Sequence, residues 1–364
     1  MAFFNLSAFY FFYFAAVGVY IIFLPKVLHD IGYTPSDIGI LFALAPLMRF
    51  LTPFLFLKHI ELTKNIFKWS LYLSVLSSLL FYITINDFTL FLINNLILGI
   101  CLSLVLPYIE VYAITQLGKS KYGKSRLYGS IGFMVVALVL ARFLDNPNVA
   151  LHYYLIATIL TAYFSILIIK SEDNSIKADD TAQDKFSVLT YWPFWLSLFL
   201  MQVSFGGFYN FFTIYETAHG ISLEMTSYLW AFGVVCEIIM LYFQAPILKN
   251  NLILVIKISI FLTIIRWLIL YLYPDSLTMT FISQSIHALS FGLYHSAVIM
   301  YLYTLYSDKK LAQQFMFGFA YGLGGFIGAI IAGWTYGEYI FLYSALIALF
   351  AFGSLYIKNI SIFR

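Results

Sequence analysis

The chain has 364 residues, of which 62% are hydrophobic and 10% charged, with a mean hydropathy of +0.90 and a net charge of +3. Because soluble domains carry about 25% charged residues, this composition excludes an ordinary soluble protein. The positive residues fall mostly in short loops, and this distribution argues against a nucleic-acid-binding protein.

Apolar runs of roughly 20 residues recur along the chain, the length that a helix needs to cross about 30 Å of hydrocarbon. Short segments rich in Gly, Pro, Asn, Asp and Ser separate these runs. We therefore predict an all-α integral membrane protein with twelve transmembrane helices. The expected spans are residues 3–25, 38–57, 66–85, 89–113, 127–144, 150–169, 191–214, 227–248, 252–273, 277–305, 311–335 and 339–357.

One long polar segment, residues 170–190, separates the first six spans from the last six. Its charge and its lack of apolar periodicity predict a flexible cytoplasmic linker. We therefore expect an N-terminal six-helix bundle over residues 1–169 and a C-terminal six-helix bundle over residues 191–364.

The two halves share a weak internal similarity, which predicts that the bundles are pseudo-symmetric. One constant shift along the chain aligns five pairs of residues, and a slightly larger shift aligns residues 128–133 with residues 321–326. Repeats of this kind place the substrate site at the interface of the two halves, near the middle of the membrane. The five pairs are Gly18 with Gly206, Gly32 with Gly220, Leu41 with Leu229, Ala43 with Ala231, and Arg49 with Glu237.

The distribution of Lys and Arg predicts the orientation in the membrane, because cytoplasmic loops carry an excess of both. With the N-terminus inside, fifteen of the 20 Lys and Arg residues fall in cytoplasmic segments, and only Lys26 and Arg142 fall outside. We therefore expect both termini to be cytoplasmic, in the inner (cytoplasmic) membrane of the cell.

Four ionisable residues lie inside predicted spans: Arg49, Glu237, Arg266 and His287. A charge near the bilayer centre costs at least about 2.5–3.5 kcal/mol, so such residues usually face a cavity and bind a solute or proton. The alternative is a packing role, as an ion pair between helices or as a neutral histidine. We predict that these four residues bind the substrate and couple its transport to a proton.

Five further residues are expected to line the same cavity. Gln284, His287 and His295 fall within a sector about 80° wide on a helix, which favours a polar lining. Glu110 lies within reach of Arg126, so an interfacial ion pair is its alternative role. The expected lining residues are His295, Gln284, Asn210, Trp230 and Glu110.

Several short motifs stand out: YGKSRLYGSIGF at residues 122–133, Trp-Ala-x-Gly-x-x-x-Glu at residues 230–237, Arg266-Trp267, and His287-Ala288 followed by His295. These motifs resemble the major facilitator superfamily, in particular its phenylpropionate-permease-like branch, which is related to lactose and nucleoside proton symporters. The resemblance covers nearly the whole chain and implies the major facilitator fold. It also implies coupling roles for an Arg and a His in the ninth and tenth spans, which Arg266 and His287 match. The chain departs from the superfamily in one loop, residues 57–64, which lacks the Gly-x-x-x-Asp-Arg pattern.

We therefore predict a secondary active transporter that carries a small organic solute, a sugar, a nucleoside or an aromatic carboxylate, together with a proton. No catalytic motif or metal-spaced Cys/His set occurs in the sequence, so we expect no enzyme activity, no metal and no cofactor other than the coupling proton. The expected partners are the solute and the lipid bilayer, without nucleic acid, and the expected state is a monomer. The alternatives are an uncoupled facilitator or exporter, a membrane scaffold or sensor that transports nothing, and a membrane-embedded enzyme.

Overall fold

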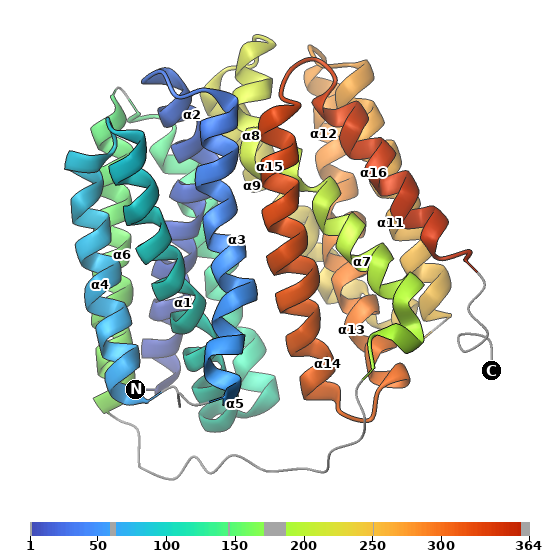
Figure 1. Ribbon diagram of the computed structural model, residues 1–364, viewed down its shortest axis with the longest axis horizontal. Helices are drawn as coiled ribbons and strands as arrows, with labels where there is room; N and C mark the ends of the chain where they lie inside the picture. Colours follow the sequence, from blue (N-terminus) through green and yellow to red (C-terminus); the bar gives the residue numbers. More distant parts are fainter. Residues whose placement is uncertain (1, 59–62, 145, 171–186, 250, 358–364) are drawn as a thin grey trace. The chain divides into compact units, whose positions relative to one another are not determined.

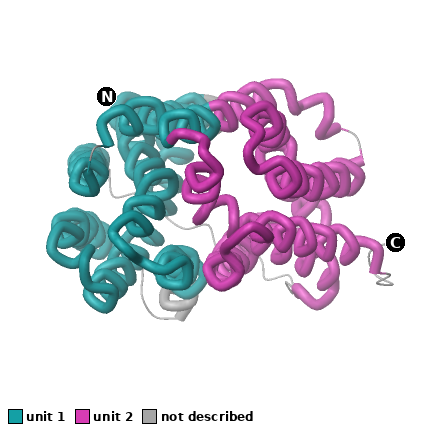
Figure 2. The backbone as a smooth tube through the Cα atoms, turned by 90° about the horizontal axis from the view of Figure 1, so that it is seen from above, with its two compact units in different colours: residues 1–176, 223–231 teal, residues 177–222, 232–364 magenta. Residues whose placement is uncertain are grey.

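The computed structural model describes residues 2–58, 63–144, 146–170, 187–249 and 251–357, and all regular elements among them are helices (Figure 1). The chain divides into two compact units (Figure 2). Unit 1 comprises Met1–Ile176 and Leu223–Ala231, and unit 2 comprises Lys177–Ser222 and Phe232–Arg364. The predicted bundle boundaries stay predictions, and most of the expected linker, like the centre of the loop at 57–64, lies outside the described residues.

Unit 1 is built around the long helix α5, against which α1, α3 and α4 pack. α6 packs against α1 and α4 and completes the unit. Aromatic side chains fill much of its core, with Phe9, Tyr10 and Phe67 fully buried. The helices are α1 (Ala2–Gly18), η1 (Val19–Phe23), α2 (Leu24–Asp30), α3 (Pro35–Lys58), α4 (Lys64–Thr84), α5 (Phe88–Leu140) and α6 (Pro147–Lys170).

The element α5 contains two helices that meet at a kink at Gly118, where φ is 70°. The kink lies within the predicted break between the spans 89–113 and 127–144, and the helices on both sides extend further into that stretch than expected. Two stretches of α5, Phe88–Gly118 and Lys121–Leu140, are each long and apolar enough to cross a membrane. The two helices reach into the polar stretch 114–126, where lysine and arginine are good helix formers, so polarity alone did not mark the helix ends.

Unit 2 places α11 at its centre, packed against α12, α13 and α16. α7 packs against α16, and α8 packs against α15. The helices are η2 (Leu189–Tyr191), α7 (Trp192–Ser204), α8 (Gly206–Ala218), the part of α9 (Leu223–Phe243) that starts at Phe232, α10 (Ala245–Leu248), α11 (Leu252–Leu272), α12 (Leu277–His287), η3 (Ala288–Leu293), α13 (Tyr294–Leu305), α14 (Lys309–Met316), η4 (Phe317–Gly324), α15 (Gly325–Trp334) and α16 (Ile340–Ser354).

Ten helical stretches among the described residues are long and apolar enough to span a membrane. The two other expected spans correspond to shorter helices. Residues 191–214 fall on α7 and α8, of 13 residues each, which are separated at Phe205. Residues 339–357 fall on α16, which has 15 residues. The count of twelve spans and the cytoplasmic termini therefore stay predictions.

Helix ends in the first half match helix ends in the second half at the sequence shift that pairs Gly32 with Gly220. The same shift pairs the end of α2 at Asp30 with the end of α8 at Ala218. Each end is followed by a glycine with positive φ, 103° at Gly32 and 84° at Gly220. The shift also pairs the start of α3 at Pro35 with the start of α9 at Leu223. This stretch of the two halves therefore has matching helix ends and matching turns.

The contact of α1 with α5 depends on a glycine, and this dependence gives a first prediction. A Cβ atom on Gly132 would lie 2.0 Å from the carbonyl oxygen of Phe11, whereas a Cβ atom on Gly123, also on α5, would meet nothing within 4 Å. We expect Gly132→Ala to lower the apparent melting temperature of the purified protein, because overpacking costs about 1–3 kcal/mol. Gly123→Ala should leave it equal or higher, because alanine favours a helix over glycine by about 1 kcal/mol. Equal melting temperatures for the two variants would contradict the close approach of α1 and α5.

Candidate functional site

Arg266 on α11 is the most deeply buried charged side chain of the predicted site, with an exposed fraction of 0%. Its Nη1 and Nη2 atoms donate hydrogen bonds to Ser290 Oγ and Gln284 Oε1, both at 3.3 Å. The guanidinium also lies over the rings of Phe208 and Trp267, 4.2 Å and 4.5 Å from their centroids. Among the described residues Arg266 makes no ion pair, so its positive charge is held by neutral groups and aromatic faces.

Glu237 and His287 form the second part of this cluster. The His287 Nε2 atom lies 3.7 Å from Glu237 Oε2, and the two side chains are 8% and 23% exposed. The close approach is possible because residue 292 is a glycine: a Cβ atom there would lie 2.9 Å from Glu237 Cγ. An imidazole can donate or accept a proton and a carboxylate can accept one, so the two groups can exchange a proton across this contact.

The cluster contains buried polar atoms without a hydrogen-bond partner among the described residues. They include Arg266 Nε, Gln284 Nε2 and His287 Nδ1. The assignment of the Gln284 amide follows from its Oε1 atom, which accepts from Arg266. Arg266 Nε and Gln284 Nε2 are therefore both donors. Since buried polar groups are normally satisfied, the unpaired donors mark a place where water or a solute with acceptor oxygens fits.

The residues of α12 that face this cluster form a polar stripe along one side of the helix. The Ser276 hydroxyl caps the helix by accepting from Met279 N at 3.5 Å. The polar residues that follow are spaced by three or four positions, which places them on one face. Ser283 donates to the Arg266 carbonyl oxygen at 3.4 Å, so the stripe also fixes α12 against α11. The stripe comprises Thr280, Ser283, Gln284 and His287, all buried.

His295 lies beyond a π-helical segment, η3, which separates it from His287. The rings of His287 and Phe291 stack with centroids 5.3 Å apart, and those of Phe291 and His295 with centroids 6.4 Å apart. His295 Nδ1 is 2.6 Å from the hydroxyl of Tyr321, which belongs to the π-helix η4. His295 therefore joins the cluster through a ring stack. Such π segments often occur at functional sites.

The remaining predicted residues occupy separate places. Arg49 is exposed on α3 in unit 1, so its predicted convergence with Glu237 stays a prediction. Asn210 donates to the Gly206 carbonyl oxygen on its own helix at 2.8 Å. Trp230 is buried and its ring lies 6.3 Å from that of Phe133.

Glu110 forms the ion pair with Arg126 that was predicted as the alternative to a place in the cavity lining. Glu110 Oε1 lies 3.5 Å from Arg126 Nε, and both side chains are about one-third exposed. The Arg126 guanidinium lies 4.0 Å from the ring centroid of Phe14. Both charges lie on α5, so the polar stretch that was read as a loop contributes a cation to unit 1. The repeated YGKSRLYGSIGF motif was the signal for it.

Glu216, which is fully buried on α8, was not predicted from the sequence. The predicted span ended at residue 214, so Glu216 was assigned to a loop. The signal was Gly220, a turn residue that follows the end of α8 at Ala218 by two positions and lies six positions beyond the expected end of the span.

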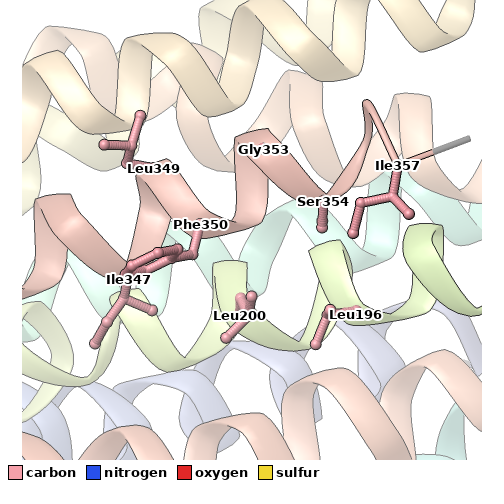
Figure 3. Close-up of a pocket in the computed structure, with 8 residues that line it drawn as sticks. All are labelled: Leu196, Leu200, Ile347, Leu349, Phe350, Gly353, Ser354 and Ile357. Atoms are coloured by element: carbon pink, nitrogen blue, oxygen red, sulfur yellow. The ribbon is translucent and has the colours of Figure 1, made fainter.

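An apolar groove of about 390 Å³ lies between α7 and α16, away from these groups (Figure 3). Its one hydroxyl, that of Ser354, donates to the Ala351 carbonyl oxygen on its own helix at 2.8 Å. The groove contains none of the predicted site residues and offers no polar group to fix a solute. Leu196 and Leu200 line it from α7, and Ile347, Leu349, Phe350, Gly353, Ser354 and Ile357 line it from α16 and the residues that follow.

Comparison with known proteins identifies relatives over almost the whole chain. The model of the MFS_1 like family matches residues 3–345. The probable 3-phenylpropionic acid transporter of Escherichia coli (strain K12) is 25% identical over 357 residues, which cover 93% of each chain. The uncharacterized transporter YwbF of Bacillus subtilis (strain 168) is 25% identical over 368 residues, 95% of this chain and 88% of its own. The crystal structure of the nucleoside transporter NupG shares the fold, with a TM-score of 0.79 at 14% identity, over 98% of this chain and 100% of its own.

The burial of Arg266 without a counter-ion gives a second prediction. Replacing a buried charged group by an apolar group of similar length is often stabilising, and functional sites commonly sacrifice stability. We expect Arg266→Met to raise the apparent melting temperature, by about 2–4 °C per kcal/mol if one unit unfolds as a domain of about 150–250 residues. The control is Lys257→Met on the same helix, where the ammonium lies 4.0 Å over the Tyr356 ring and is only partly buried. A fall in melting temperature for Arg266→Met alone would show that its hydrogen bonds and aromatic contacts outweigh the cost of the buried charge.

Proposed function

The chain belongs to the MFS_1 like family and is a multi-pass membrane transporter of the major facilitator type, and we propose that it imports an aromatic carboxylate together with a proton. In this proposal it acts as a monomer in the inner membrane, with both termini in the cytoplasm. Arg266 and Gln284 bind the carboxylate, Glu237 and His287 carry the proton, and Arg49 adds positive charge from the first half. The supporting observation is the buried, unpaired charge of Arg266 beside unsatisfied hydrogen-bond donors.

The charges of the cluster in unit 2 explain how solute and proton would be coupled. With Glu237 ionised, Arg266 and Glu237 balance each other and the empty cluster is neutral. A proton alone leaves a net positive charge, and a carboxylate alone leaves a net negative charge. Because uncompensated charge is costly in a low dielectric, only the empty cluster and the cluster with both ligands reorient readily. This rule yields symport of one proton with one carboxylate.

The chemistry of the cluster favours an aromatic carboxylate over the other solute classes. A carboxylate offers acceptor oxygens to Arg266 Nε and Gln284 Nε2. The rings of Phe208, Trp267 and Phe291 make the surroundings of the cluster rich in aromatic side chains, an environment that suits a solute with an aromatic ring. The name of the Escherichia coli relative points to the same class of solute. The nucleoside named for the structural neighbour and a sugar are the competing classes.

Ligand stabilisation of the purified protein tests the substrate class. A ligand at about 100 times its dissociation constant stabilises the native state by about 2.7 kcal/mol. We expect 3-phenylpropionate to raise the apparent melting temperature, and the neutral 3-phenylpropan-1-ol to leave it unchanged because it lacks the carboxylate. Equal shifts with the acid and the alcohol, or a shift with uridine or lactose instead, would overturn the assignment of a carboxylate.

The variant Glu237→Gln tests the coupling. In proteoliposomes with an imposed pH gradient, we expect this variant to lose accumulation of 3-phenylpropionate and to keep exchange of labelled for unlabelled solute. The reason is that glutamine keeps the shape and polarity of glutamate but cannot take up the proton. The control is Glu224→Gln on the same helix, where the carboxylate is exposed and pairs with Arg142 at 3.1 Å.

The alternative of an uncoupled facilitator makes a different prediction for the same vesicles. Its solute would equilibrate without accumulation in the wild-type protein, and the external medium would not become alkaline when solute is added. Unaltered accumulation in Glu237→Gln would instead remove Glu237 from the coupling mechanism.

A further inference from the structure

Glu216 is a buried carboxyl group outside the cluster of Arg266, Glu237 and His287. It lies near the end of α8 with an exposed fraction of 0%. Its Oε2 atom is 3.4 Å from Thr280 Oγ1 on α12, and its Oε1 atom has no hydrogen-bond partner among the described residues. No described basic side chain forms an ion pair with it. The structure therefore gives Glu216 one weak polar contact and nothing that would compensate a negative charge.

The one hydrogen bond that reaches Glu216 is weak. The Thr280 hydroxyl has a single hydrogen and two acceptors in range, the Ser276 carbonyl oxygen at 3.2 Å from its Oγ1 atom and Glu216 Oε2 at 3.4 Å. The Ser276 contact, one turn earlier on the same helix, is the usual one for a helical threonine. Thr280 therefore offers Glu216 at most a shared donor. A fully buried carboxyl group with so little compensation for a negative charge fits a neutral Glu216.

The titratable groups around this end of α8 do not change that conclusion. His219 on the same helix is turned to the Tyr215 carbonyl oxygen, with its Nδ1 atom at 2.8 Å. Arg266 on α11 is engaged with Gln284 and Ser290. Asp275, Tyr336 and Glu338, in the turns that precede α12 and α16, are electrostatic neighbours of Tyr215, and two of them are acids that would repel a further negative charge.

The first half of the chain provides an internal comparison for this position. At the shift that relates the ends of α2 and α8, Glu216 corresponds to Leu28, which is also fully buried. The same helix end therefore packs with an apolar residue in one half. A carboxyl group is not needed to build this part of the fold, and its burial calls for another explanation.

Two polar contacts join the end of α8 to α11 and α12. Tyr215 donates from its hydroxyl to the Leu270 carbonyl oxygen on α11 at 3.2 Å, and Glu216 contacts α12. At its other end α8 is separated from α7 at Phe205. The packing of α8 on α15 does not involve these two contacts. Opening of the two contacts would admit water to Glu216.

We propose that Glu216 is a second proton-binding group of this protein, neutral while α8 is packed on α12 and ionised only when that contact opens to water. The polar stripe of α12 leads from Thr280 toward His287 and Glu237, so Glu216 is placed to exchange protons with the outside before they reach the cluster. The role of Glu216 in passing protons to the cluster rests on the proposed symport. The link between the proton on Glu216 and the contact of α8 with α12 is independent of the proposed symport.

Infrared spectroscopy of the purified full-length protein, without solute, tests the proton directly. The carbonyl stretch of a neutral carboxylic acid lies at higher wavenumber than the stretches of a carboxylate. We expect a neutral-acid band at neutral pH that is absent in Glu216→Gln and in Glu216→Leu, and present in Glu224→Gln. Glu216→Leu should fold, because leucine occupies the equivalent position 28. A spectrum of the wild-type protein that matches Glu216→Gln in this region would overturn the proposal.

The reactivity of a buried cysteine tests the movement. Thr213 lies one turn before Glu216 on α8 and is 2% exposed, so Thr213→Cys, with Cys101→Ala and Cys236→Ala, reports on the opening of this face. A maleimide labels this cysteine in two proteins, one with Glu216 and one with Glu216→Gln. We expect the ratio of the first labelling rate to the second to rise with pH, by up to about tenfold per pH unit, as for one titrating group. A ratio that stays constant between about pH 6 and about pH 9 would overturn the link to opening. Failure of solute uptake alone would leave both tests intact and would count only against the proposed symport.

Discussion

Hydrogen bonds and charges inside an apolar helix bundle must be satisfied by the protein itself, because lipid offers no partners. This constraint decides how α11 and α12 meet. Arg266 is held by the side chains of Gln284 and Ser290, and Ser283 bonds back to the Arg266 carbonyl oxygen. These partners are all neutral, so they hold the guanidinium in place without cancelling its charge. The electrostatic potential of Arg266 therefore remains available to a ligand.

Departures from regular helix geometry accompany the polar groups of unit 2. The π-helix η3 lies between His287 and His295, and the π-helix η4 carries Tyr321, the hydroxyl partner of His295. Ser290, inside η3, supplies one of the acceptors of Arg266. A π turn weakens the regular backbone pattern and is seldom kept without a reason. The π segments occur where Ser290, His295 and Tyr321 make their polar contacts. We infer that the irregular helix geometry positions these side chains.

Much of this arrangement was predictable from the sequence, for identifiable reasons. Arg266 and His287 stand on consecutive antiparallel helices joined by a short turn, so their depths could be compared directly. Glu237 joins them from α9 through tertiary packing that residue spacing does not encode. Glu216 was missed because its helix runs past the expected end of the span, to Ala218. The ion pair of Glu110 with Arg126 was predicted as an alternative. The helical conformation around Arg126 was not, although lysine and arginine are good helix formers.

The matching helix ends of α2 and α8 mean that each half of the chain can serve as the other's reference. At one such pair of positions, both fully buried, the first half has Leu28 and the second half has Glu216. Where paired positions differ in this way, the apolar residue shows that the shared helix geometry does not require the ionisable group. The ionisable residue is then a candidate for a functional role.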